Sequence, residues 1–182
     1  MENNICAVID AQGFTSNGIF YPRELAIVSD NLNDCVQIDT KLDYASMSQK
    51  DKRTNMYLEH YLLGMPLRPY RALLGLKTAE VYSTIENWYE MVATDKSSIL
   101  GVKNYQLEEI VKSINIPYFS LFECPKGEKL DNKYGPIWFC AYHTHLPKNN
   151  NKARCSRRKA TYIWKWLNSG KTVEFETGSK HF

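Results

Sequence analysis

The fold is decided by the stretch ICAVIDAQGFTSNGIFYPRELAIV, residues 5–28. Its first part, Ile5 to Ile9, is a short run rich in β-branched residues and predicts a strand that ends at Asp10. Asn17-Gly18 is a strong signal for a tight hairpin turn. A second strand, antiparallel to the first, should therefore follow through Ile19–Val28.

The rest of the apolar pattern predicts an α/β fold. Pro22 cannot donate a ladder hydrogen bond, so we expect a bulge or an edge position there. Three antiparallel strands in a meander, followed by alternating helices and strands, predict one mixed sheet flanked by helices. Further strands are expected at Cys35–Ile38, Ile99–Val102 and Tyr118–Phe122, helices from Thr78 to Val92, over Leu107–Ile114 and from Cys155 to Leu167, and a polar loop with at most one helical turn at Lys41–Arg53.

Composition limits the class of protein. The chain has 182 residues, 43% of them apolar and 13% aromatic, which is enough for one core and argues against disorder. It contains no apolar run of the roughly 18 residues that a membrane span requires, and its first residues do not resemble an export signal. Five scattered cysteines in such a chain predict reduced thiols, available to a metal. We expect one intracellular domain over residues 1–182, without a membrane partner, with its core at about 5–168 and a C-terminal tail at 171–182.

Positive charge is concentrated in one segment. The net charge is only +3, yet residues 132–173 contain no Asp or Glu. A basic segment in a nearly neutral protein favours a polyanionic partner, most often nucleic acid, although a solvated helix face beside a charged loop would give the same pattern. The positive residues of the segment are Lys133, Lys148, Lys152, Arg154, Arg157, Arg158, Lys159, Lys165 and Lys171.

A metal-binding pattern lies in the same segment. Cys140-Ala141-Tyr142-His143 is a Cys-x2-His pair, and Cys155 follows at the start of the last predicted helix. Two thiolates and an imidazole at this spacing suit zinc, because a two-residue gap lets both side chains of the pair turn toward one ion. In the alternative interpretation Cys140 is a small buried residue after the strand-like run 137–139, and His143 is a loop residue. The fourth zinc ligand stays open among His145, Cys124 and a distant carboxylate.

The predicted first strand carries a second pattern. Asp10 stands at its end, and Gln12 follows two residues later. Two-metal nucleases place an Asp-x-Glu at this point, because neighbouring carboxylates supply hard oxygen ligands to Mg²⁺. An amide lacks the charge that a metal pair requires, so this strand end is typical of a damaged nuclease site. Asp10 could equally be a turn residue bonded to its own backbone.

These residues resemble known families. Ile9–Gly13, the hairpin and Pro22–Val28 are similar to the opening of DnaQ-type (DEDDh) exonucleases, in which an Asp-x-Glu strand precedes a Glu-Ile-Gly-x-Val strand. Glu24 with Cys140, His143 and Cys155 resembles more closely the Glu-Cys-His-Cys zinc set of the Maelstrom domain, an RNase H-like fold of the piRNA pathway. The segments Glu59-His60 and Met65-Pro66-Leu67 are similar to the His-x-Ile loop of both families, and Ile99–Lys103 to the strand before the second helix. The resemblance covers residues 5 to 168 and implies one structural zinc held by Glu24, Cys140, His143 and Cys155.

The chain departs from the exonuclease pattern where acids are needed. The family's second-site Asp follows the strand at Ile99–Val102, where this chain has Lys103 and Asn104. The family's last His and Asp lie near the start of the last helix, where this chain has Cys155 and the basic run 157–159. One carboxylate cannot hold two Mg²⁺ ions, so exonuclease activity should be absent. The remnants of the degenerate nuclease site are expected to be Asp10, Gln12 and Lys103.

The resemblance to the Maelstrom domain implies binding of single-stranded RNA in small-RNA silencing, in the cytoplasm, the perinuclear region or the nucleus. Basic side chains at a helix N-terminus reach phosphates while the helix amides add their own positive end. Trp138 and Tyr142 are expected to stack bases or to pack in the core. Two alternatives stay open: an endoribonuclease with a mechanism of another kind, and a protein-interaction module of a silencing complex. The expected RNA-binding residues are Lys152, Arg154, Arg157, Arg158 and Lys159.

Overall fold

The chain folds around one mixed sheet flanked by helices. The computed structural model describes residues 4–40, 42–67, 75–122, 124, 140, 143 and 155–169. Within these residues the strands lie in the order β4-β3-β2-β1-β5-β6. The antiparallel meander β1-β2-β3 and the parallel pairs β1-β5 and β5-β6 agree with the sequence prediction. The strand bounds are Ile5–Ser16 (β1), Ile19–Val28 (β2), Asn33–Asp39 (β3), Leu76–Lys77 (β4), Ile99–Val102 (β5) and Tyr118–Ser120 (β6).

The β1-β2 hairpin follows from its turn residues. Asn17 and Gly18 both have positive φ angles, 51° and 80°, as a two-residue hairpin turn requires. The predicted irregularity at Pro22 is confirmed, because the register shifts between Gln12 and Gly13. Gly13 is required at this point, since a Cβ atom there would lie 2.2 Å from the carbonyl oxygen of Tyr21. The bulge keeps both strands paired on either side of it.

The first strand is longer than the sequence predicted. The expectation that it ends at Asp10 is wrong, because pairing with β2 continues through the bulge as far as Ser16. Asp10 pairs with Ala26, and Gln12 pairs with Glu24. Asp10 is therefore a buried strand residue rather than a turn residue.

A full helix begins inside the predicted loop at Lys41–Arg53 and replaces its last five residues. α1 spans Gln49–Tyr57 and continues as a π-helical segment, η1, over Leu58–Leu63. The polar sequence of α1 gives no helical pattern, and the helix is held by a contact with the β1-β2 hairpin. The buried Asn55 side chain accepts from the Thr15 N–H at 3.2 Å and donates to the Thr15 carbonyl at 2.7 Å. Asn55 thus satisfies the backbone at the end of β1, where a strand partner is missing.

The other helices lie close to their predicted positions. α2 begins at Glu80 rather than Thr78, and the Glu80 carboxylate accepts from the Lys77 N–H at 2.6 Å. The predicted C-terminal stop at Gly170 and the tail at 171–182 lie outside the described residues. The bounds are Glu80–Val92 (α2), Tyr105–Ser113 (α3) and Ser156–Leu167 (α6).

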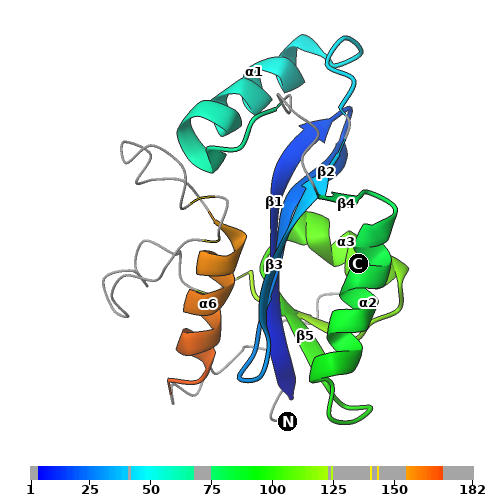
Figure 1. Cartoon of the computed structure of the whole chain (residues 1–182), viewed down its shortest axis with the longest axis vertical. Coiled ribbons are helices and arrows are strands. Elements are labelled where there is room, and N and C mark those ends of the chain that lie inside the picture. Colours follow the sequence, from blue (N-terminus) through cyan, green and yellow to red (C-terminus); the bar gives the residue numbers. More distant parts are fainter. Residues whose placement is uncertain are drawn as a thin grey trace, which may run out of the picture.

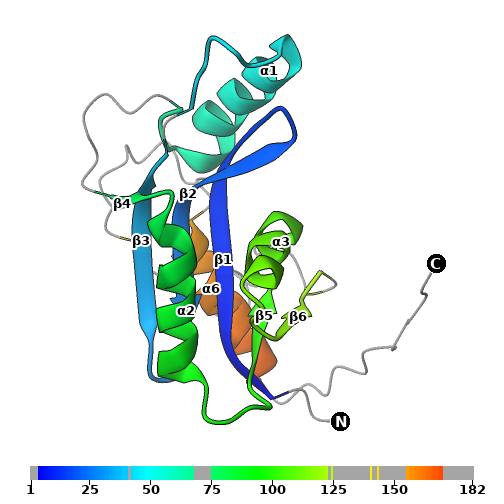
Figure 2. The same cartoon turned by 90° about the vertical axis from the view of Figure 1, so that its right-hand side faces the viewer.

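The two faces of the sheet have different partners, as Figure 1 shows with α6 on one side and α2 and α3 on the other. In the view turned by 90°, α2 and α3 lie in front of the sheet, and α1 lies at the end of the sheet where the β1-β2 hairpin turns (Figure 2). Ile9 and Leu25 pack with α2 and α3, whereas Val8 and Val28 pack with Ala160 and Ile163 of α6. Because side chains alternate along a strand, Asp10, Gln12 and Glu24 lie on the α6 face. None of the described helices is both long and apolar enough to cross a membrane.

Candidate metal centre

Four side chains that are far apart in the sequence meet at the start of α6. They are Glu24 of β2, Cys140, His143, and Cys155, which is the N-cap residue of α6. All four are buried, and one possible ligand atom from each lies within 4.8 Å of the others. The spacing of the motif left the fourth ligand open, and the resemblance to the Maelstrom domain implied Glu24. The structure brings in the carboxylate of Glu24, whereas Cys124 packs in the core under α6 and His145 lies outside the described residues.

The contacts within the group are short. His143 Nδ1 lies 3.0 Å from Cys140 Sγ and 3.2 Å from Glu24 Oε2. Cys155 Sγ lies 3.3 Å from Glu24 Oε1 and 3.4 Å from the backbone nitrogen of Cys140. A tetrahedral ion with bond lengths of about 2.0 to 2.3 Å holds its ligand atoms roughly 3.3 to 3.8 Å apart. The spacing of the group is therefore close to what such an ion requires.

A contact outside the group fixes which nitrogen of His143 faces it. Nε2 of His143 lies 2.9 Å from the carbonyl oxygen of Leu63, the last residue of η1. A carbonyl oxygen can only accept, so Nε2 carries a proton and donates it. Nδ1 is then the nitrogen that faces Glu24 and Cys140, and in the neutral imidazole it offers a lone pair to an ion. Metal-ligating histidines are commonly oriented by a second hydrogen bond of this kind.

The buried Glu24 carboxylate is paired with His143, which is positive only when it is protonated. Its Oε2 atom is buried and makes no hydrogen bond to the described residues, and it lies 3.2 Å from Nδ1 of His143. A buried carboxylate in that situation is costly unless a cation neutralises it. Two thiols, an imidazole nitrogen and a carboxylate around one point form a suitable donor set for a metal ion.

The thiols of the group hold their protons when no ion is bound. The pKa of Cys140 is raised to about 12: its hydrogen bond with Cys155 lowers the pKa, but the hydrogen bond with Cys35, burial and the charge of Glu24 raise it by more. The pKa of Cys155 is raised as well, first by its hydrogen bond with Cys140 and then by burial. Binding of an ion must therefore release protons. All five cysteines are free thiols in the structure.

Sequence reasoning missed one neighbour of this group, Cys35 of β3. Its Sγ atom lies 3.2 Å from Glu24 Oε1, and it also hydrogen-bonds to Cys140. The signal that could have placed Cys35 beside Glu24 was the pairing register of β2 and β3. Cys35 pairs with Ala26 and Gln37 pairs with Glu24, so both face the same side as Glu24.

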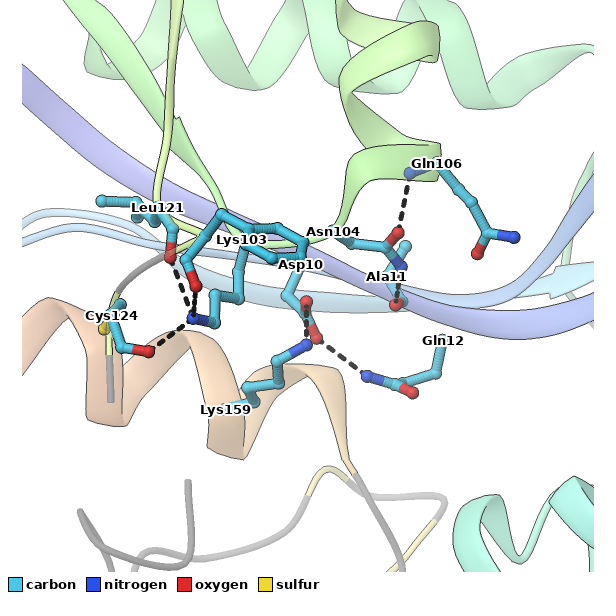
Figure 3. A network of polar contacts seen from close by, with 10 residues as sticks. Asp10, Ala11, Gln12, Lys103, Asn104, Gln106, Leu121, Cys124 and Lys159 are labelled. Carbon is cyan, nitrogen blue, oxygen red and sulfur yellow. Dashed lines mark hydrogen bonds and ion pairs between the residues drawn. The ribbon is translucent and has the colours of Figure 1, made fainter. Parts of the chain in front are cut away.

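Asp10 lies on the same face of the sheet as Glu24, and Figure 3 shows its network of polar contacts. Asp10 is fully buried, and its Oδ1 atom forms an ion pair with Lys159 Nζ at 2.7 Å. Its Oδ2 atom accepts from Gln12 Nε2 at 3.0 Å. Both carboxylate oxygens are therefore engaged by protein side chains.

Lys103 and Asn104 are also engaged by the fold. The Lys103 ammonium donates to the carbonyl oxygens of Leu121, Phe122 and Cys124 at 2.9, 2.8 and 2.5 Å (Figure 3). Burial lowers the pKa of Lys103. Asn104 caps α3 by accepting from the Gln106 N–H. Neither residue can replace the acid that a two-metal site needs here.

The predicted RNA-binding residues are only partly described. Lys152 and Arg154, like Trp138 and Tyr142, lie outside the described residues. Arg157 donates to Asn33 Oδ1 at 2.8 Å, and Arg158 donates to the Tyr162 hydroxyl at 3.3 Å. Lys159 turns inward to Asp10, so its charge is used within the protein. No acidic residue lies in the first turn of α6.

The segment that resembles the His-x-Ile loop contacts the metal centre through the Leu63 carbonyl, which accepts from His143. Glu59 Oε1 accepts from the Leu67 N–H at 2.9 Å, which closes the turn after η1. His60 is exposed and takes no part in the centre.

Comparison with protein-family models and with curated protein sequences finds no match for this chain.

Proposed function

We propose that the chain is a zinc-stabilised RNA-binding domain of the Maelstrom type, with an RNase H-like fold and without two-metal nuclease activity. The observation that carries the proposal is the meeting of Glu24, Cys140, His143 and Cys155 in one buried group. The mixed sheet, with its antiparallel meander and added parallel strands, is consistent with the proposed fold. Five cysteines without a disulfide are consistent with action inside the cell.

Zinc is the proposed ion, with one per chain, and its role is structural. Sulfur, nitrogen and oxygen ligands in a four-residue set are typical of zinc. The four ligands would leave no open position for a substrate, since all of them come from the protein and are buried. The ion would join β2, the segment around Cys140 and His143, and the start of α6. Such a site contributes directly to the stability of the fold.

The Asp10 network supports the absence of nuclease activity. A two-metal mechanism needs several carboxylates around two Mg²⁺ ions. Here Lys159 and Gln12 occupy the two oxygens of Asp10, and the Lys103 ammonium lies nearby. Positive charge therefore stands where the mechanism would need divalent cations. A degenerate site of this kind fits a protein that binds RNA without trimming it.

RNA binding would rest on the basic side chains around the start of α6. A helix N-terminus attracts anions, and α6 has no acidic residue in its first turn to compensate. Lys152, Arg154 and Arg157 are the residues we assign to phosphate contacts, with Arg158 beside them. By analogy with the Maelstrom resemblance, the bound molecule would be single-stranded RNA of a small-RNA silencing pathway.

One experiment tests the proposal in two readouts. Protein purified without chelator is analysed for metals, and its binding to labelled single-stranded RNA is titrated at several salt concentrations. We expect one zinc per chain and an affinity that falls steeply with salt. Protein without zinc would contradict the metal centre. Zinc-loaded protein that binds no RNA would point instead to a protein-interaction module, and cleavage without added metal would point to an endoribonuclease.

A further inference from the structure

Cys35 lies at the edge of the metal centre on β3, the strand that pairs with the Glu24 strand β2. Its thiol lies 3.2 Å from Glu24 Oε1, and the thiol of Cys155 lies 3.3 Å from the same oxygen. Cys35 also hydrogen-bonds to Cys140. One carboxylate oxygen is therefore shared by two thiols, one inside the four-residue group and one at its edge.

We propose that Cys35 is a fifth donor of this centre and binds the ion in place of Glu24. The inference rests on the proposed zinc site and concerns which side chains hold the ion. Replacement turns the set of two thiolates, one imidazole and one carboxylate into three thiolates and one imidazole. Both sets are found in four-coordinate zinc sites, so the coordination number stays at four.

The exchange conserves charge and oxidation state, and it starts from a thiol that already contacts the Glu24 carboxylate. The bond from the ion to the Glu24 oxygen breaks, and a bond to Cys35 Sγ forms. The thiol proton of Cys35 passes to the Glu24 carboxylate, 3.2 Å away. Nothing is oxidised or reduced, and no further reactant is required.

The ligand set with Cys35 differs from the set with Glu24 in solvent exposure and in the ions that it favours. Glu24, Cys140, His143 and Cys155 are buried, whereas Cys35 is partly exposed. Cys35 is therefore the one thiol of the five-residue set that solvent partly reaches. Soft ions prefer thiolates to carboxylates, so Cd²⁺ should select the set with Cys35 more strongly than Zn²⁺ does.

The test uses Co²⁺ and Zn²⁺ with the full chain and four variants of nearly unchanged size. These are Glu24→Gln, Cys35→Ser, the double variant, and Cys6→Ser as the matched control. Cys6 is a partly buried cysteine that packs in the other core. The thiolate-to-cobalt charge-transfer absorption counts the bound thiolates, and competition with a chelator gives the zinc affinity.

We expect the Glu24→Gln protein to show more intense charge transfer than the Cys35→Ser protein, because it binds through three thiolates rather than two. Zinc affinity should fall by roughly tenfold or less in Glu24→Gln, and by about a further hundredfold in the double variant. Cys6→Ser should match the wild type. Equal intensity in the two single variants, or equal affinity of Glu24→Gln and the double variant, would overturn the inference. Wild-type protein that binds neither ion would overturn the zinc centre itself.

A second measurement needs no substitution at the site. Wild-type protein is alkylated with iodoacetamide with and without bound Cd²⁺, and each cysteine is followed by mass spectrometry. Cys35 should be protected by Cd²⁺, while Cys6 should react at the same rate in both samples. If Cd²⁺ binds and leaves the rate at Cys35 unchanged, Cys35 is not a ligand and the inference is wrong.

Discussion

The ammonium of Lys159 lies 2.7 Å from Oδ1 of Asp10, so a helix side chain neutralises a fully buried strand carboxylate. The pair joins α6 to the middle of β1, next to the metal centre. Lys159 keeps 29% of its side chain exposed, whereas Asp10 keeps none. Loss of Lys159 would therefore leave a buried negative charge, whereas loss of Asp10 would leave an ammonium that water still reaches.

Lys159→Met should destabilise the protein by roughly 2 to 4 kcal/mol, because it leaves Asp10 buried with only Gln12 as a partner. Denaturant unfolding measures the effect. Adding Asp10→Asn to Lys159→Met should restore most of the stability, since the buried charge is then removed. Lys165→Met, at an exposed position of the same helix, is the control. Equal stability of Lys159→Met and this control would show that the pair contributes nothing.

Removal of the metal should lower the melting temperature by about 10 °C or more, because a structural site supplies folding free energy to its surroundings. The same loss should follow from Cys155→Ser without chelator, and chelator should then have no further effect. Cys124→Ser, outside the ligand group, should keep its response to chelator. Thermal unfolding with and without chelator provides the comparison, and a wild type indifferent to chelator would rule out a stabilising ion.

Metal affinity should rise with pH. Cys140 and Cys155 have raised pKa values and are protonated at neutral pH in the metal-free protein, whereas a bound ion requires thiolates. Two released protons give a rise of roughly a hundredfold in affinity per pH unit. Burial lowers the pKa of His143, but its contacts with Cys155 and Glu24 raise it above the ordinary value, so acid weakens binding further. Chelator competition between about pH 6 and pH 8 measures the slope, and a flat profile would contradict thiolate ligation.

Mg²⁺-dependent trimming of single-stranded RNA should be absent in the wild type and unchanged in Asp10→Asn. The substitution keeps the shape of the side chain and removes its charge, so it isolates any role of the carboxylate as a metal ligand. A labelled RNA of defined length, incubated with Mg²⁺ or with chelator, is the substrate. Trimming that needs Mg²⁺ and disappears in Asp10→Asn would mean that the site is active.

RNA affinity should fall when phosphate-binding residues are replaced outside the Asp10 pair. Lys152→Ala, Arg154→Ala and Arg157→Ala together spare Lys159, whose charge is used internally. Each phosphate-binding side chain removed should flatten the dependence of log affinity on log salt by about 0.7, so the triple variant should flatten it by roughly two. The control removes three exposed lysines away from α6, at positions 77, 96 and 112. If both triple variants bind RNA alike, the RNA-binding surface lies elsewhere or is not localised.

Local signals in the sequence predicted most of the sheet. Asn17-Gly18 specifies a turn that needs positive φ at both residues, and the apolar period of α2 is evident without tertiary context. α1 was missed because it is mostly polar and depends on Asn55 meeting the backbone of Thr15, 40 residues away. Cys35 was missed for a similar reason, since its place beside Glu24 depends on strand register.

The direct pairing of Gln12 with Glu24 across β1 and β2 has a consequence for the charge of the metal-free protein. An acid at position 12 would face Glu24 on the buried side of the sheet, and like charges directly opposite each other destabilise a strand pair. A Gln12→Glu protein would meet that repulsion whenever the ion is absent, including during folding. The amide at position 12 therefore lets Glu24 stay buried and ionised before an ion arrives.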